Sequence, residues 1–310
     1  MGKRSRTKTR TRLATPGEVG PRQPCPCGSG RRYKACHGAA GGGPAPYVGR
    51  PFEGLTSECD LVAMRDLVPA ATAPLALQDS ERQVVLCSVL PGAAPALVRD
   101  SGAIWLGLQV QHDFGDPARD LGAVLVRALD AETGVVGLTD PPGPGPRLQD
   151  LVLDEPWQVT VHDGFDFWVS DLDEVPEALQ AAIEQANAAA SPTRRLSGVG
   201  AAYWTDVGAK EHLRWVMPQP EDALLDALAR LHAAGQDRLV PDGRLVGMFR
   251  AYGLLAPVWD LVPGTGAAAL QEPAAAFAEA LEQALADETP LTAQERSARS
   301  GLANRQVTIR

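Results

Sequence analysis

Four amphipathic segments, each with a proline near its start, constrain the fold of this chain more than any other feature. They read "DPARDLGAVLVRAL", "VPEALQAAIEQAN", "QPEDALLDALARLHAAG" and "EPAAAFAEALEQALA". Proline is tolerated at an early helical position because its missing N–H would have no partner there. Apolar residues then recur at helical spacing, as at Leu224, Leu228 and Leu231. We therefore predict helices at about 116–129, 175–187, 219–235 and 272–286.

Runs rich in β-branched and aromatic residues lie upstream of these segments. They are "VVLCSVL", "AIWLGLQVQ", "PWQVTV", "FDFWVS", "AAYWTDV", "HLRWVMP" and "APVWDLV", and they hold all six tryptophans. Such runs are typical of strands. The pattern predicts an α+β body over 52–288, built of ββα-like units in which helices cover a mixed or antiparallel sheet. Two similar subdomains are compatible with it, and residues 289–310 are expected to form a C-terminal helix or tail.

One hairpin is predicted in detail from "WQVTVHDGFDFWV", residues 157–169. A three-residue loop over 162–164 would pair Val161 with Phe165. Trp157, Val159, Phe165 and Phe167 would then share the core face, because shifting the register by one residue moves side chains to the other face. Gly164 is expected to have a positive φ in a bulged turn.

A cluster of metal-ligand residue types lies near the N-terminus, in "CPCGSGRRYKACHG". Cys25, Cys27, Cys36 and His37 offer three thiols and one imidazole, the donors that tetrahedral zinc takes in a closed structural site. Iron is a less favoured metal. A disulfide between Cys25 and Cys27 would close a very small ring, and chance clustering is the remaining alternative. The glycines of the loop permit a tight turn, and a short helical turn would carry Cys36 and His37 back to the metal.

This stretch resembles the SEC-C motif, a zinc module found at the C-terminal end of the SecA translocation ATPase and in other bacterial proteins. The resemblance implies the ligands Cys25, Cys27, Cys36 and His37. The rest of the chain resembles an uncharacterised family of high-GC Gram-positive bacteria, sometimes labelled preprotein translocase SecA. No G-x-x-x-x-G-K-[ST] phosphate loop is present, and 310 residues are too few for a helicase motor. In the SecA family the motif recruits a secretion chaperone and touches the ribosome, so the resemblance implies a binding role.

A basic arm precedes the motif. Its alternating cations are Arg4, Arg6, Lys8, Arg10 and Arg12. In an extended chain they would point to one side, ~6.6 Å apart, and could follow phosphates. The favoured partner is ribosomal RNA; a solvated tail and membrane lipid are the alternatives. Three further cations inside the motif, Arg31, Arg32 and Lys34, are candidate partner-binding residues.

The charge of the chain is divided between two parts. Residues 1–38 hold ten of the 29 Lys and Arg but only one of the 38 acids, Glu18, so they carry +9 and the remaining residues carry −18. Such asymmetry suggests different partners for the arm and the body. We divide the N-terminal region into a disordered arm (1–24), a zinc module (25–38) and a Gly- and Pro-rich flexible linker (39–51). With no apolar transmembrane run and no secretory signal, a cytoplasmic protein is expected.

No familiar catalytic motif is present. The pairs His112-Asp113 and His162-Asp163 are interpreted as loop residues, since neighbours in a strand point to opposite faces. Two further histidines have no partner visible in the sequence, and the two cysteines of the body are interpreted as structural. We therefore expect a non-catalytic zinc-containing adaptor whose acidic body binds an unknown partner. The alternative is an enzyme whose catalytic residues are scattered through the body.

Overall fold

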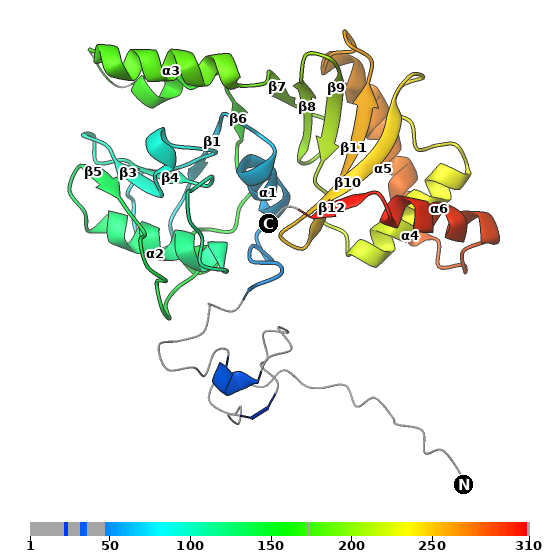
Figure 1. Cartoon of the computed structure of the whole chain (residues 1–310), viewed down its shortest axis with the longest axis horizontal. Helices are drawn as coiled ribbons and strands as arrows, with labels where there is room; N and C mark the ends of the chain where they lie inside the picture. Colours follow the sequence, from blue (N-terminus) through cyan, green and yellow to red (C-terminus); the bar gives the residue numbers. More distant parts are fainter. Residues whose placement is uncertain (1–21, 24–31, 36–46, 171, 173, 309–310) are drawn as a thin grey trace. The chain divides into compact units, whose positions relative to one another are not determined.

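The computed structural model of the chain describes residues 22–23, 32–35, 47–170, 172 and 174–308 (Figure 1). The chain divides into two compact units, Met1–Val48 with Phe114–Asp116, and Gly49–Asp113 with Pro117–Arg310. The described part of the first unit contains a short 3-10 turn, η1 (Tyr33–Ala35), and a backbone hydrogen bond of 2.9 Å from Val48 N to Gly115 O. The second unit contains two six-stranded sheets.

The first sheet has the strand order β5-β3-β4-β2-β1-β6. Its strands are β1 (Ala71–Leu75), β2 (Val84–Cys87), β3 (Ala96–Val98), β4 (Ile104–Gly107), β5 (Gly134–Val136) and β6 (Thr160–Val161). Neighbouring strands are antiparallel except β2 and β4, which are parallel. Helix α2 (Pro117–Leu129) packs on β3, β4 and β5, and most of its apolar side chains are buried. Helices α1 (Glu58–Asp66) and α3 (Glu177–Ala189) belong to the same unit.

The second sheet has the order β12-β10-β11-β9-β8-β7. Its strands are β7 (Thr193–Arg195), β8 (Ala202–Asp206), β9 (Glu211–Trp215), β10 (Arg244–Ala251), β11 (Leu254–Leu261) and β12 (Gln306–Thr308). Only β12 runs parallel to its neighbour, β10. The hairpin of β10 and β11 turns through Tyr252 and Gly253, both with positive φ, at 47° and 82°. Two such residues make the turn whose twist matches that of the flanking strands.

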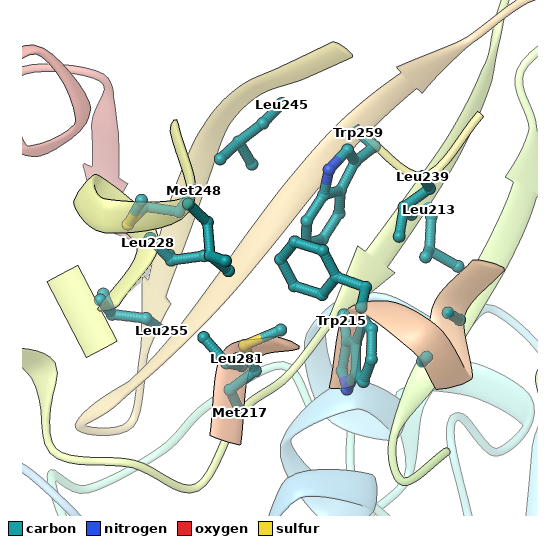
Figure 2. Packing of buried hydrophobic residues seen from close by; sticks show 14 of the residues in the cluster. Leu213, Trp215, Met217, Leu228, Leu239, Leu245, Met248, Leu255, Trp259 and Leu281 are labelled. Atoms are coloured by element: carbon teal, nitrogen blue, oxygen red, sulfur yellow. The ribbon is translucent and has the colours of Figure 1, made fainter. Parts of the chain in front are cut away.

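Helices α4 (Glu221–Ala233), α5 (Gln271–Ala286) and α6 (Ala293–Ala303) accompany the second sheet. The side chains of α4 and α5 pack with strand residues in one large apolar core (Figure 2). Trp259 is fully buried there, with Phe277 edge-on at 5.2 Å and Trp215 at 6.3 Å between ring centroids. Its indole N–H donates to Asp237 O at 2.8 Å, so the only polar atom of this large side chain is satisfied.

The remaining short turns are η2 (Pro91–Ala93), η3 (Leu148–Asp150), η4 (Asp166–Val169) and η5 (Ala268–Leu270). The predicted α+β class is confirmed, with six α-helices and two mixed sheets in the described part of the chain. The four proline-initiated helices are confirmed, with the proline at or next to the start of α2, α3 and α4 and in the first turn of α5. None of the described helices is long and apolar enough to cross a membrane.

The prediction of a hairpin over 157–169 is wrong. Strand β6 pairs with β1, through Val161 and Ala71, and the residues expected to form its partner strand make the 3-10 turn η4 instead. Gly164 is not among the residues with positive φ. The side chain of Asn187 in α3 accepts a 2.6 Å hydrogen bond from the backbone N–H of Phe165. A residue more than twenty positions away therefore determines this turn, which local alternation of polarity could not reveal.

Candidate functional site

The described part of the N-terminal motif shows how its chain returns on itself. The backbone N–H of Tyr33 donates to Gln23 O at 2.8 Å. Gln23 lies two residues before Cys25, and Tyr33 lies three before Cys36. This bond therefore brings together the two chain segments that precede the predicted ligands. The 3-10 turn η1 lies within the segment predicted to form a helical turn.

The exposed side chains of Arg32 and Lys34 flank the partly buried Tyr33. They are the predicted partner-binding residues that the structure describes. The others lie outside the described residues: Arg4, Arg6, Lys8, Arg10, Arg12 and Arg31. The predicted ligands Cys25, Cys27, Cys36 and His37 lie outside them too, as does most of the predicted linker.

The donor set of the motif suits a metal of the zinc type. Three thiolates and a neutral imidazole complete a tetrahedral shell and leave no open position. Elsewhere, the described residues contain no group of three or more His, Cys, Asp or Glu arranged to hold a metal ion. The motif is thus where the chemistry of a metal site is concentrated in this sequence.

Helix α1 carries buried charges that the sequence analysis missed. Asp60 accepts two hydrogen bonds of 2.9 Å from the guanidinium of Arg195 and one of 2.6 Å from the hydroxyl of Tyr203. Burial, followed by the nearby Asp60 charge, raises the pKa of Tyr203 well above its usual value. Because Arg195 and Tyr203 lie on β7 and β8, this cluster joins α1 to the second sheet.

A second cluster lies farther along the same helix. The guanidinium of Arg65 donates to Tyr252 Oη and to Leu108 O, each at 2.6 Å, and is 3.4 Å from Asp113. Burial raises the pKa of the neighbouring Asp66 to about 6, with Arg65 opposing and Asp113 adding to the shift. These contacts join α1 to the β10–β11 turn and to the end of β4. Asp113 therefore has a tertiary partner.

Three of the four body histidines, His162, His212 and His232, lie beside carboxylates or hydroxyls of other residues. His232 Nδ1 is 2.6 Å from Asp237 Oδ2, and His212 Nδ1 is 3.1 Å from Asp260 Oδ1. His162 lies 2.8 Å from Thr72 Oγ1, and its ring stacks on an aromatic side chain. Burial lowers the pKa of His162, against the opposing charge of Asp163. The partners of His212 and His232 were missed because Asp260 and Asp237 meet them only through sheet pairing and a loop.

The two body cysteines behave as the structural interpretation expects. Burial raises the pKa of Cys59 to about 12, with Glu58 and Asp60 adding to the effect. Burial also raises the pKa of the fully buried Cys87 to about 12. Both thiols are therefore protonated at neutral pH, and the thiol is a much weaker nucleophile than the thiolate.

Two open hollows adjoin on the second sheet. One, of about 480 Å³, lies at the ends of β9, β10 and β11; the other, of about 290 Å³, lies over the same strands and reaches β12. Asp260 lines both. Most of the charged residues that line the two hollows are basic.

In the comparison with known proteins, the motif and the body match different family models. Residues 22–39 match the SEC-C motif. A stretch of 29 residues is 55% identical to the protein translocase subunit SecA of Rubrobacter xylanophilus, covering 9% of this chain and 3% of the length of that protein. No solved structure matches the chain. The likeness to SecA is therefore local and extends no further than the motif region.

The body matches a different family model. It covers residues 51–310, which include every strand of both sheets and all six α-helices. This match spans most of the chain, whereas the SEC-C match spans only the short segment before it. The chain thus belongs to the family described as a family of unknown function, DUF5926, and carries a SEC-C motif in front of the family's domain.

Proposed function

We propose that this protein is a non-catalytic, zinc-containing adaptor. Residues 1–38 dock on the ribosome through its RNA, and the acidic body binds a second protein. A secretion chaperone is the alternative partner of the same segment. The observation that carries the proposal is the Tyr33–Gln23 backbone hydrogen bond together with the exposed side chains of Arg32 and Lys34, in a segment that follows a strongly basic arm in the sequence.

Zinc has a structural role in this proposal. Cys25, Cys27, Cys36 and His37 would hold it, and the metal would fix the shape of a module too small to form an apolar core. We expect about one zinc per chain in purified protein, with loss of the metal when Cys27 or Cys36 is replaced by Ser. Thermal unfolding of the body should change little on chelation, since the body has its own core. A large fall in its melting temperature would contradict an independent module.

Charge is the second component of docking. The arm would supply attraction to RNA phosphates through release of counterions, so affinity should fall steeply with salt. The acidic body would be repelled from RNA, since residues 39–310 carry −18, and it would remain available to another protein. The folded module would add shape selectivity to an attraction that is otherwise non-specific.

Co-sedimentation with ribosomes at low and moderate salt tests the docking role. The full chain should sediment with ribosomes at low salt, and a form lacking residues 1–38 should not. The double variant Arg32→Gln/Lys34→Gln should weaken binding. The matched control Arg127→Gln/Arg296→Gln removes two exposed cations from the body and should leave binding unchanged. Equal sedimentation of the full and shortened chains, or none of either, would refute ribosome docking and leave the chaperone to be tested.

A further inference from the structure

The second sheet has one face covered by helices and one face on which charged side chains gather. Strand pairing places Thr205, His212, Asp260 and Arg244 in one row across the sheet. Arg214 and Val258 lie in the next row on the same face, because residues two apart in a strand point the same way. The apolar core lies on the opposite face, through Leu213, Trp215 and Trp259 (Figure 2).

We call the two adjoining hollows on this face the basic groove. Its basic lining residues are Lys210, Arg214, Arg238, Arg244 and Arg305. Its acidic lining residues are Asp242 and Asp260. Without His212 the groove carries +3, although residues 39–310 together carry −18. Such a local reversal of sign attracts an anionic partner.

Arg214 is the member of the groove that most needs a partner. Its Nε is buried and has no hydrogen-bond partner among the described residues. Its Nη1 has one long contact, 3.4 Å from Leu67 O. Asp260, in the adjacent row on this face, is bound by Lys210 at 2.6 Å. A guanidinium is suited to a planar, bidentate carboxylate, and this one lacks it.

The floor of the groove is apolar. Gly247, Phe249, Val258 and Val307 line the same hollow. Val307, on the edge strand β12, is 59% exposed. Gly247 also has a packing requirement, because a Cβ there would lie 2.6 Å from Arg305 O. The groove thus offers an apolar surface next to cations. Its lining residues come mainly from neighbouring strands, which lie in the sheet in the order β9, β11, β10 and β12 (Figure 1).

We propose that the basic groove binds an extended acidic peptide segment of a partner protein, with a carboxylate on Arg214 and apolar side chains on Phe249, Val258 and Val307. This rests on the proposed adaptor function, in which the body has a protein partner. The two aspartates within the groove disfavour a uniformly charged polyanion such as RNA. Four strands at about 4.8 Å spacing correspond to about four or five residues of extended peptide.

The test uses the full chain and a short fluorescent peptide in which Asp and Leu alternate. Because the basic arm also attracts acids, the assay is run in a variant with Gln at positions 4, 6, 8, 10 and 12. Fluorescence anisotropy should show binding that is lost with the matching Asn-Leu peptide. Arg214→Gln and Arg244→Gln should each weaken binding about tenfold, as expected for loss of one charge-assisted hydrogen bond. Arg214→Lys should restore part of the loss.

Arg127→Gln, which removes a cation from α2, should bind the peptide normally, and circular dichroism should show that every variant is folded. The proposal is overturned if the acidic peptide does not bind, or if Arg214→Gln and Arg244→Gln leave its binding unchanged. Polyuridylate is titrated in the same assay. If it binds as tightly as the acidic peptide and Arg214→Gln weakens its binding, the ligand of the groove is a nucleic acid and the proposal is overturned. Ribosome co-sedimentation of Arg214→Gln should match that of the unaltered chain, so this test and the docking test fail separately.

Discussion

The two sheets of the body have the same number of strands but are stabilised in different ways. The second contains a hairpin of two eight-residue strands, β10 and β11, and a continuous core around Trp259. The first has strands of two to five residues, and its outer parts depend on distant polar groups. Ser57, for example, accepts a 2.8 Å hydrogen bond from the backbone N–H of Trp157. Local sequence therefore encodes the second sheet well and the first sheet less well.

Removing an aromatic ring from each sheet should show the largest difference. Trp259→Ala leaves a cavity between Trp215 and Phe277 and should lower the free energy of unfolding by about 4 kcal/mol. Trp105→Ala, on the partly exposed face of the first sheet, should cost about 1–2 kcal/mol, since less surface is buried there. Urea unfolding monitored by circular dichroism measures both. Equal losses in the free energy of unfolding would show that aromatic packing contributes equally to the stability of the two sheets.

The connection between α1 and the second sheet can be broken at Asp60. Asp60→Ala leaves Arg195 and the hydroxyl of Tyr203 without their carboxylate and should cost about 3 kcal/mol. The matched control is Asp163→Ala, which breaks the exposed ion pair with Arg194 and should cost about 0.5 kcal/mol or less. Hydrogen exchange should then show lower protection in α1 and β8. Unchanged protection there would mean that apolar contacts alone join α1 to the sheet.

Glu211 holds a loop of the second sheet, as Asn187 holds a turn of the first. Its carboxylate accepts from Gly264 N at 2.5 Å, Gly266 N at 2.8 Å and the indole of Trp204 at 2.7 Å. Burial opposes its ionisation, but these donors outweigh burial and lower the pKa of Glu211. Glu211→Gln should cost about 2 kcal/mol at neutral pH, because charged hydrogen bonds become neutral ones.

The pH dependence of this contribution has a definite sign. A carboxylate with a lowered folded-state pKa stabilises the protein above the ordinary glutamate value of 4.5, and the contribution is lost as the pH falls through the lower folded value. The stability difference between the unaltered protein and Glu211→Gln should therefore shrink below about pH 4.5. A difference that stays constant from neutral to acidic pH would mean that packing, and not charge, causes the loss.

The smallest expected effect concerns the turn that replaced the predicted hairpin. Asn187→Ala removes the acceptor of the Phe165 N–H and should cost about 1 kcal/mol. Asn187→Asp keeps an acceptor oxygen for Phe165, but it replaces the amide that donates to Asp166 at 3.1 Å by a second carboxylate, so it should retain only part of the stability. Thermal unfolding compares the two. If Asn187→Ala has no effect, the turn depends on the packing of Phe165 and Trp168, whose rings lie 4.6 Å apart.

Much of the fold was accessible from periodicity. Proline at the helix start and apolar residues at helical spacing predicted α2 to α5, because both signals lie within the helix itself. Ser57 is the N-cap residue of α1, but its side chain accepts from the backbone N–H of Trp157 and makes no capping bond to the helix. The α+β class followed from the same local signals. The body's buried polar clusters did not, because their members come from separate elements.

The sequence by itself determined helices α2 to α5, the strands of regular alternation, the charge division between 1–38 and the remaining residues, and the SEC-C motif. Each of these depends on residues close together in the chain. Only the tertiary structure decided the turn at 165–169, the partners of Asp60 and Arg65, and the groove around Arg214. Their energies come from pairing across strands and from burial of polar groups. Such terms depend on which distant residues meet, and no local pattern specifies that.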